Sequence, residues 1–501
     1  MRGIPSLITD IRKNVFTEVA KMAYSGGDYT KAEDLPFVIV PGDQPLHRES
    51  IFLERAIAGE RVRLAMGLSL QPVQSRQLIT EGMDNAAIAE QYYEPPLVNI
   101  IPYACHACPT NSYKVTAHCQ NCLAASCRKV CPKGAISFVN GRSYIDEEKC
   151  IKCGKCQKAC PYNAIIHLER PCQAACGMDA IVSDEHGRAT INQDKCVSCG
   201  MCLVSCPFGA IVDKGQIFQV IQSILKGDQV IAIVAPAFAG QFGKNATPER
   251  FTTAMRKLGF DRVTEVAVGA DMCTIEEAKD FLEKVPSQQN YMATSCCPAW
   301  HSMIYKLFPS ETDKISMTLT PMVFTARLMK QQYPGCKVVF VGPCAAKKLE
   351  AIRSDIRSDV DFVLTFEELQ GMFQAKDIDF ETMEEGDTLN QASAYGRGFA
   401  VSGGVAQAVT DLIHKTNPDM EIKTARAEGL RECRKLITLA KAGKYDGYLL
   451  EGMACPGGCV AGAGTLLPVD LAAKIIGRYQ NESDIESPMD SEFRHAGENL
   501  D

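Results

Sequence analysis

The sequence predicts a multi-domain α/β protein, in which a helical N-terminal region and several ferredoxin-like iron–sulfur modules precede a larger α/β domain. Three observations predict this class. The chain has 501 residues, which is more than one hydrophobic core accommodates. Sixteen of its 24 cysteines lie between residues 100 and 212. From residue 228 onward, short β-rich runs alternate with loops and helical segments, a pattern typical of parallel α/β layers.

These observations divide the chain into four parts. Residues 1–98 form a helix-rich N-terminal region, because apolar residues recur at helical spacing across 51–68, and no catalytic motif occurs there. Residues 99–214 form a ferredoxin-like multi-cluster domain, and residues 215–480 form the larger α/β domain. Residues 481–501 are a polar C-terminal tail that we expect to be frayed.

Charge and hydropathy argue against several functions. The formal net charge is −7, whereas a protein that binds nucleic acid usually presents a basic face. A small basic patch for docking an electron carrier stays open. No run of about 18 apolar residues occurs, so we expect no membrane span. The first residues lack the apolar core of a signal peptide, and we expect a cytoplasmic location.

The cysteines of the middle region follow iron–sulfur spacing. In a reducing compartment C-x-x-C runs bind metal, so disulfides are the weaker alternative. Residues 150–160 and 196–206 match the bacterial ferredoxin run C-x-x-C-x-x-C-x-x-x-C-P. Zinc is the other alternative, but zinc sites rarely use three such steps followed by proline. The spacing therefore predicts 4Fe–4S clusters.

Ligands can be assigned because, in a two-cluster ferredoxin, the fourth cysteine of each run binds the neighbouring cluster. Applied to all sixteen cysteines, this rule gives four sets, each for one accessory 4Fe–4S cluster. The first set is Cys119, Cys122, Cys127 and Cys160; the second is Cys131, Cys150, Cys153 and Cys156; the third is Cys176, Cys196, Cys199 and Cys202; the fourth is Cys105, Cys108, Cys172 and Cys206. For the fourth set, the alternative is that Cys105 and Cys108 are spare thiols.

In the larger domain, each cysteine motif follows a predicted strand. TSCCPAW contains Cys296 and Cys297, GPCAAKKLE contains Cys344, and EGMACPGGC contains Cys455 and Cys459. Loops after parallel strands gather ligands at one edge of the sheet, where backbone N–H groups favour an anionic cluster. If four thiolates from these loops hold one cluster, one of the adjacent pair stays free.

These three motifs, in this order, resemble the signature motifs of the FeFe-hydrogenase catalytic domain, and the resemblance covers about residues 100–470. It implies a two-lobed α/β catalytic domain that carries an H-cluster. The H-cluster is a 4Fe–4S cubane joined through one cysteine sulfur to a di-iron unit with CO, cyanide and azadithiolate ligands. Departures such as Ala237, Gly342 and Met322 resemble a less-studied subgroup of the family.

The resemblance implies a role for each of the five cysteines. Cys297, Cys344, Cys455 and Cys459 hold the cubane, and Cys459 bridges to the di-iron unit. Cys296 is then the free thiol that passes protons to the azadithiolate amine. A thiol suits this task because its pKa is nearer to neutrality than that of a hydroxyl.

The resemblance implies further site residues. Lys347 lies three residues after Cys344, about one helical turn, and directs its ammonium at a cyanide ligand. Met453 packs near the di-iron unit, with ordinary core packing as the alternative. Pro236 and Ala237 belong to a loop whose backbone approaches a cyanide.

A proton relay to Cys296 is implied as well. Glu277 and Asp280 match the two acids of the family helix, and Ser316 matches the hydroxyl between them. The acids are three residues apart and so share one helix face, with a merely solvated face as the alternative. Lys348, next to the motif lysine, is expected to be an ordinary surface lysine with no role in the site.

The implied activity is the reversible reduction of protons to dihydrogen, 2H⁺ + 2e⁻ ⇌ H₂, with electrons relayed through the accessory clusters to or from a ferredoxin-like carrier. Hydrogenase maturation proteins are implied partners, because the di-iron unit does not assemble by itself. A non-catalytic hydrogenase-like iron–sulfur assembly protein is one alternative, and a redox or hydrogen sensor is another. Cys273, Cys336 and Cys433 fit no motif, and we expect them to be buried apolar fillers.

Overall fold

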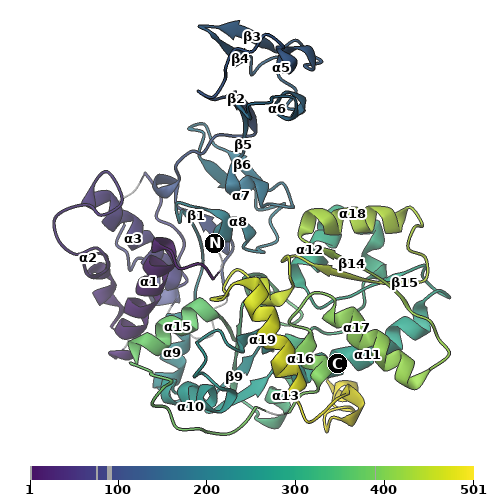
Figure 1. The fold of residues 1–501 in the computed structure, drawn as a ribbon. Coiled ribbons are helices and arrows are strands. Elements are labelled where there is room, and N and C mark those ends of the chain that lie inside the picture. Colours follow the sequence, from purple (N-terminus) through teal and green to yellow (C-terminus); the bar gives the residue numbers. More distant parts are fainter. Residues whose placement is uncertain (1–2, 27, 75–76, 87–92, 390, 501) are drawn as a thin grey trace.

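The computed structural model describes residues 3–26, 28–74, 77–86, 93–389 and 391–500. Figure 1 shows a broad body in which helices surround two sheets, and a small lobe of strands and short helices that projects from it. We call this projecting lobe, residues 112–168, the head. The predicted class, a multi-domain α/β protein with a helical start, is confirmed.

The N-terminal region is helical, as predicted. Ser6 and Ser50 each accept a hydrogen bond from a backbone N–H of the following turn, so side-chain caps begin both long helices. The first helix packs against α9 (Ile217–Lys226) and α15 (Phe366–Ala375) of the larger domain. The elements of this region are α1 (Leu7–Tyr24), η1 (Tyr29–Glu33), α2 (Leu35–Ile39), α3 (Ile51–Ala65) and α4 (Met83–Ala86).

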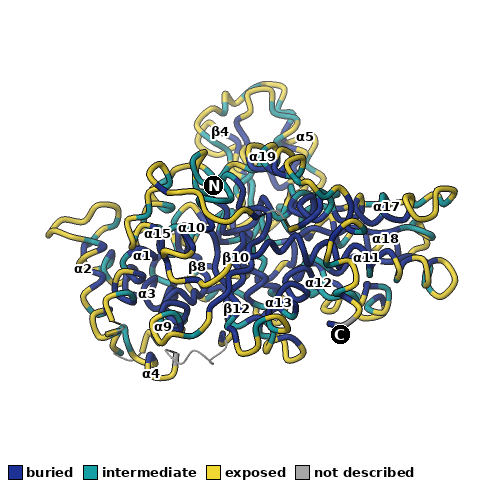
Figure 2. The backbone as a smooth tube through the Cα atoms, turned by 90° about the horizontal axis from the view of Figure 1, so that it is seen from below, coloured by how far each residue is buried: buried dark blue, intermediate teal, exposed yellow. Residues whose placement is uncertain are grey.

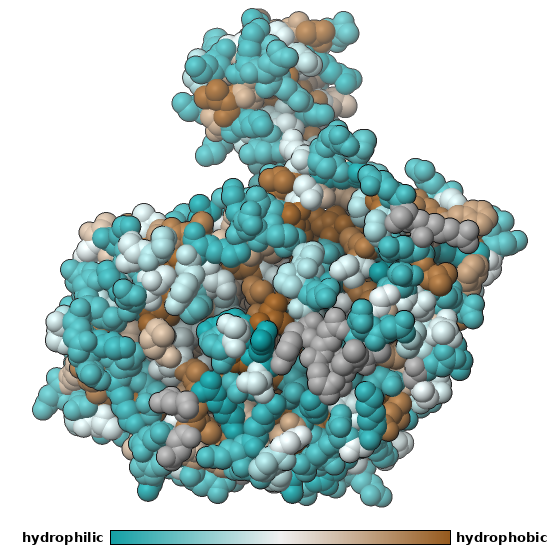
Figure 3. Space-filling model, turned by 180° about the vertical axis from the view of Figure 1, so that it is seen from behind, coloured by the Kyte–Doolittle hydropathy of each residue, from teal (hydrophilic) through white to brown (hydrophobic). Residues whose placement is uncertain are grey.

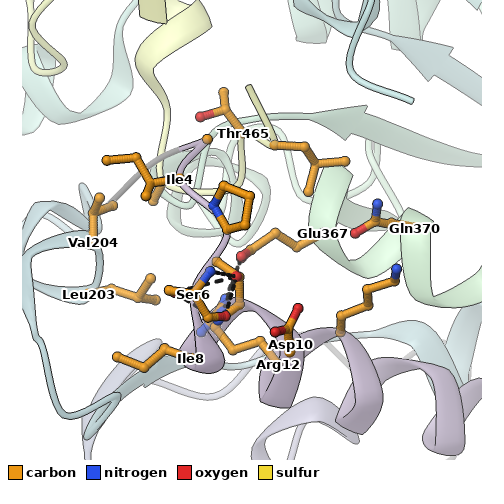
Figure 4. Close-up of a pocket in the computed structure, with 16 residues that line it drawn as sticks. Ile4, Ser6, Ile8, Asp10, Arg12, Leu203, Val204, Glu367, Gln370 and Thr465 are labelled. Carbon is orange, nitrogen blue, oxygen red and sulfur yellow. Dashed lines mark hydrogen bonds and ion pairs between the residues drawn. The ribbon is translucent and has the colours of Figure 1, made fainter. Parts of the chain in front are cut away.

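A buried ion network fastens α1 to the rest of the protein. Arg12 Nη2 lies 3.2 Å from Asp213 Oδ1 and 2.6 Å from Glu367 Oε2. Arg12 and Glu367 border a pocket of about 220 Å³ between the start of the chain and α15 (Figure 4). Lys348 Nζ lies 2.7 Å from Asp213 Oδ2 and 3.1 Å from Glu368 Oε2. The expectation of an ordinary lysine is wrong: the Lys348 side chain is 1% exposed, because carboxylates of two other elements enclose it.

The cluster region consists of two-stranded antiparallel ladders and one-turn helices. The ladders pair β1 with β8, β2 with β5, β3 with β4 and β6 with β7. Ala125, Gly154 and Gly200 adopt left-handed conformations directly before α5, α6 and α8, so the same turn precedes each of these three helices. The elements are β1 (Val98–Ile100), η2 (Pro102–Ala104), β2 (Ser112–Val115), α5 (Ser126–Lys129), β3 (Ile136–Val139), β4 (Arg142–Ile145), α6 (Lys155–Lys158), β5 (Ile165–Leu168), α7 (Pro171–Ala174), β6 (Ile181–Ser183), β7 (Ala189–Ile191), α8 (Met201–Ser205) and β8 (Ile211–Asp213).

Two parallel sheets form the larger domain. One has the strand order β10-β9-β12-β13 and the other has the order β11-β15-β14. The apolar run VIAIV forms β9, an inner strand that is buried along its whole length. The predicted strands are confirmed, and the two sheets form two lobes. The strands are β9 (Val230–Val234), β10 (Arg262–Glu265), β11 (Met292–Ala293), β12 (Lys337–Gly342), β13 (Phe362–Thr365), β14 (Lys423–Glu428) and β15 (Tyr448–Met453).

Helices follow most of these strands and enclose a buried interior (Figure 2). Thr365 and Glu368 form a capping box at the start of α15, where each side chain accepts a hydrogen bond from the other residue's backbone N–H. None of the helices in the described ranges is long and apolar enough to cross a membrane. The remaining helices are η3 (Pro236–Phe238), α10 (Pro248–Leu258), α11 (Ala267–Lys284), α12 (Pro298–Leu307), η4 (Pro309–Lys314), α13 (Pro321–Gln332), α14 (Ala346–Ala351), α16 (Ala394–Gly398), α17 (Gly404–Thr416), α18 (Leu430–Lys441), η5 (Cys459–Ala461) and α19 (Val469–Asn481).

The C-terminal segment is packed, so the expectation of a frayed tail is wrong. It contains η6 (Pro488–Asp490) and η7 (Gly497–Asn499), which contact α11. Ser487 and Ser491 are buried, and the Leu500 carbonyl accepts a hydrogen bond of 2.7 Å from Arg327. The segment is polar in composition, and composition does not indicate tertiary contacts of this kind.

Candidate functional site

The three cysteine loops converge on one cavity of the larger domain. Cys296 and Cys297 follow β11, Cys344 follows β12, and Cys455 and Cys459 follow β15, so both sheets contribute. All five cysteines line a cavity of about 90 Å³. The structure therefore brings together thiols that are far apart in the chain. Four other predicted site residues line the same cavity: Pro236, Ala237, Lys347 and Met453.

Glycines allow these loops to approach closely. A Cβ at Gly462 would lie 2.3 Å from the carbonyl oxygen of Pro343, and one at Gly458 would lie 2.4 Å from the backbone nitrogen of Ser402. Gly458 also has a φ of 87°, in the left-handed region that favours glycine. A side chain at either position would push the Cys459 loop away from its neighbours, so the glycines are needed for the convergence.

Backbone N–H groups face the thiols. Burial raises the pKa of Cys297, while N–H groups at the start of α12 and from Ala454 act against this rise. Burial likewise raises the pKa of Cys344 to about 11, against N–H groups at the start of α14. Burial and the neighbouring thiols raise the pKa of Cys459 to about 12. Without a metal ion, thiols with such raised pKa values stay protonated. When a metal ion replaces the proton, the backbone N–H groups are already in place to hydrogen-bond the thiolate sulfur.

The donor set fits an iron–sulfur cluster. Thiolate sulfur is the usual ligand of such clusters, and four thiols from three loops surround one cavity. A cubane receives its thiolates at four separate corners. Nowhere in the described ranges do three His, Cys, Asp or Glu side chains gather closely enough to hold a single metal ion. Five thiols leave one more than a cubane uses.

Cys296 lies beside a buried acid. Burial raises its pKa well above the usual value, and the Glu277 and Glu451 carboxylates raise it further. Glu277 is completely buried, and burial raises its pKa to about 7. Its Oε1 accepts a hydrogen bond of 3.0 Å from the backbone N–H of Ser295, while its Oε2 has no hydrogen-bond partner among the described residues. Both groups of the Cys296–Glu277 pair are therefore poised to hold a proton.

The other two predicted relay residues lie together, away from the cavity wall. Ser316 Oγ donates a hydrogen bond of 3.2 Å to Asp280 Oδ2, and Lys284 pairs with Asp280 Oδ1 at 2.5 Å. The structure places Ser316 on the Asp280 side and not in contact with Glu277. Ser295 contacts Glu277 instead, and sequence reasoning missed it although it stands inside TSCCPAW.

Lys347 lines the cavity and is held by two partners. Its Nζ lies 2.6 Å from Glu350 Oε2 and 3.2 Å from Thr320 Oγ1. Glu350 is one helical turn further along α14, so the helix itself orients the ammonium group. Sequence reasoning missed Glu350, although the spacing of Lys347 and Glu350 is a signal for such a pair.

The first and second sets of cysteines lie in the head. All four cysteines of the first set line one small cavity. In the second set, burial raises the pKa of Cys156, and Cys150 and Cys131 raise it further, so these thiols are neighbours. Cys153 belongs to the same turn and is exposed.

The third and fourth sets lie between the head and the cavity. Burial raises the pKa of Cys202, with Cys199, Cys196 and Cys176 adding to the rise, so the third set is together. In the fourth set, burial raises the pKa of Cys172 to about 11, and the other thiols add to it in the order Cys206, Cys105, Cys108.

The sets follow one another toward the cavity. Cys172 of the fourth set also raises the pKa of Cys202 in the third set. Cys297, at the cavity, likewise contributes to the raised pKa of Cys199 in the third set, which burial brings to about 12. None of the 24 cysteines, all of which lie in the described ranges, forms a disulfide, and the predicted fillers are buried: Cys273, Cys336 and Cys433.

Ferredoxin-like modules that lead to a cysteine-lined cavity between two parallel sheets define a class of iron–sulfur protein. Residues 228–463 match the family "Iron only hydrogenase large subunit, C-terminal domain", and residues 143–166 and 189–212 match "4Fe-4S binding domain". The periplasmic Fe hydrogenase large subunit of Nitratidesulfovibrio vulgaris is 31% identical over 373 residues, which are 64% of this chain and 85% of that subunit. The chain belongs to the FeFe-hydrogenase (iron-only hydrogenase) family.

Similarity extends to relatives of two kinds. Iron hydrogenase 1 of Clostridium pasteurianum is 29% identical over 390 residues, which cover 66% of this chain and 67% of that protein. A probable cytosolic Fe–S cluster assembly factor of Aedes aegypti is 26% identical over 277 residues, covering 45% and 58%. Among solved structures, a variant of an FeFe-hydrogenase from Chlamydomonas reinhardtii superposes with a TM-score of 0.45 at 21% identity, over 54% of this chain and 89% of that one.

Proposed function

We propose that this chain is an FeFe-hydrogenase that interconverts protons and electrons with dihydrogen at an H-cluster in the cysteine-lined cavity. The observation that carries the proposal is the fifth thiol. Cys296 lines the cavity beside Glu277, where a protein that only holds a cubane has no need for it. The pairing of a thiol with a buried acid is the arrangement that proton transfer requires.

In this proposal Cys297, Cys344, Cys455 and Cys459 would hold the H-cluster, with Cys459 on the side of its di-iron unit. When bound, the H-cluster supplies the electrons and the iron site for hydrogen chemistry. Pro236, Ala237 and Met453 form apolar wall around the di-iron unit and exclude water. The Lys347 ammonium, oriented by Glu350, supplies a positive charge toward the cyanide ligands.

Proton movement falls to the chain's own side chains. Cys296 Sγ would donate its proton to the group bound in the cavity, and the resulting thiolate would take a proton from the Glu277 carboxyl. Glu277, with a pKa of about 7, releases and regains a proton near neutral pH. Asp280 and Ser316 pass protons onward toward the surface, because Asp280 is only half-buried. No direct hydrogen bond joins Ser316 to Glu277 among the described residues, so a water molecule completes the relay.

The H-cluster needs a supply of electrons and an assembly pathway. Four accessory 4Fe–4S clusters, one on each of the four cysteine sets, exchange electrons with a ferredoxin-like carrier. Maturation proteins insert the di-iron unit, and the protein acts in the cytoplasm. The proximity of Cys172 to Cys202 and of Cys199 to Cys297 supports this order of sets.

A second function has its own support. The similarity to a probable cytosolic Fe–S cluster assembly factor favours a non-catalytic iron–sulfur protein on the same scaffold. Such a protein does not need the Cys296–Glu277 pair.

Infrared spectroscopy of the matured full-length protein separates the two functions. We expect bands of iron-bound CO and cyanide, together with hydrogen evolution from reduced viologen. Competently matured preparations that carry the cubane but lack these bands would favour the assembly function.

A further inference from the structure

A hydrogenase exchanges electrons with a carrier, so the carrier must bind to a surface of the protein near one of the predicted clusters. We propose that an acidic electron-carrier protein docks on the head, on the surface formed by residues 149–158 around Cys153. This inference rests on the proposed function for the identity of the partner as an electron carrier. The surface combines an exposed cysteine, exposed lysines and exposed apolar side chains.

Exposure singles out Cys153. It is exposed, whereas each of the other 23 cysteines is half-buried or buried. The head projects from the body (Figures 1 and 3), and residues 151–153 on it are exposed. A partner that binds here approaches a predicted cluster ligand directly.

Charge selects the partner. Residues 112–168 contain nine Lys or Arg and three Asp or Glu, a net charge of +6, whereas the whole chain has −7. The body is therefore strongly acidic and the head is basic. An acidic protein is repelled by the body and attracted to the head, so electrostatic steering favours this one docking site.

The lysines next to Cys153 are available for a partner. Lys152, Lys155 and Lys158 are all exposed. In the described part of the head, the ion pairs are Lys149 with Asp146 and Lys114 with Glu147. The three lysines around Cys153 thus carry uncompensated positive charge.

An exposed apolar side chain completes the surface. Ile151 is 54% exposed directly beside Lys152 and Cys153. Val130, at the end of α5, is also exposed, and α5 packs against α6. Apolar side chains within a rim of lysines are typical of a small interface that binds a charged partner transiently.

The test measures binding and needs no hydrogen turnover. The probe is a bacterial ferredoxin with two 4Fe–4S clusters and a net negative charge, titrated calorimetrically into the cluster-loaded full chain. We expect the dissociation constant at low ionic strength to rise at least tenfold in the double variant Lys152→Glu/Lys155→Glu. The difference should vanish at about 0.5 M salt, where such attractions are screened.

The matched control is Lys226→Glu/Lys474→Glu, which changes the net charge equally at two exposed positions of the body. It should bind the ferredoxin within twofold of the wild type. Equal weakening in both double variants, or no weakening in the first, would overturn the docking site. If the variant Lys152→Glu/Lys155→Glu loads less iron than the wild type, the charge-neutral variant Lys152→Gln/Lys155→Gln is measured in its place. An unchanged dissociation constant in that variant would again overturn the site. Infrared bands report on the hydrogenase function separately, so either idea can fail alone.

Discussion

Cys296 and Cys297 are neighbours in the chain, yet their surroundings differ. Backbone N–H groups hydrogen-bond the sulfur of Cys297, which favours a thiolate that a metal ion can bind. Cys296 instead faces the Glu277 and Glu451 carboxylates, which favour its protonated form. Hydrogen-bond donors on one side and acids on the other thus give the two thiols opposite tasks.

Replacing the free thiol tests its task. We expect Cys296→Ala to lower hydrogen turnover about 10²- to 10⁴-fold, the usual cost of losing a positioned proton donor, with iron content unchanged. Cys273→Ala is the control, because Cys273 is buried near Glu277 but does not line the cavity. A loss of iron in Cys296→Ala would instead make Cys296 a ligand.

The buried acid predicts a pH dependence. Burial raises the pKa of Glu277 to about 7, so the carboxyl is protonated below this pH and ionised above it. We expect the pH–rate profile of the wild type to change slope near pH 7. Glu277→Gln should lack that change and be slower, with unaltered cluster spectra. Its neighbour Glu276, which pairs with Lys279 at the surface, provides the control variant Glu276→Gln. Equal profiles for wild type and Glu277→Gln would remove Glu277 from the relay.

At the scale of elements, buried charges join regions that are distant in sequence. Arg12 of α1, Asp213 of β8 and Lys348 of α14 meet with Glu367 and Glu368 of α15. Burial alone would raise the pKa of Asp213, but Lys348 and Arg12 hold it at about 2. The N-terminal helix is therefore fixed to the cluster region and to the larger domain by the same network.

Breaking this network should destabilise the protein. Lys348→Met leaves the Asp213 and Glu368 carboxylates buried without their shared cation, and we expect a loss of about 3–5 kcal/mol in the free energy of unfolding. Chemical denaturation of the cluster-loaded protein measures it. Lys435→Met removes an exposed lysine that pairs with Glu432 and should change stability by less than about 0.5 kcal/mol. Similar small changes in both variants would contradict the importance of the network.

Secondary structure was readable from the sequence where it depends on neighbouring residues. The apolar run of β9 and the capping residues Thr365 and Glu368 are local signals, and the structure contains both elements. Lys348 and the C-terminal segment were misjudged, because their burial depends on distant partners such as Asp213 for Lys348 and Arg327 for Leu500, each more than 100 residues away. Composition alone assigns such polar residues to the surface.

For the whole molecule, the first and second cysteine sets belong to the projecting head (Figure 1), and the fourth and third sets follow one another toward the cavity. The fourth set does not form a continuous spacing motif, because its cysteines come from three separate loops. The raised pKa of Cys172 beside the other three thiols places them in one neighbourhood.

Iron analysis tests the fourth cluster. We expect Cys105→Ala/Cys108→Ala to contain four fewer iron atoms per chain than the wild type, because a 4Fe–4S cluster loses two of its four ligands. Iron and acid-labile sulfide are measured on the purified full-length protein. Cys336→Ala, which removes a buried thiol outside every set, should keep the full content. An unchanged iron content in the double variant would mean that Cys105 and Cys108 are spare thiols.

The sequence by itself determined the cysteine spacings, the strands that precede each motif and the family motifs, because all of these depend on residues close together in the chain. Only the tertiary structure decided which distant side chains meet. It placed Ser295 and not Ser316 on Glu277, paired the cavity-lining Lys347 with Glu350, and buried Lys348. The physical reason is that burial and ion pairing arise where separate elements pack together, and no local pattern records that packing.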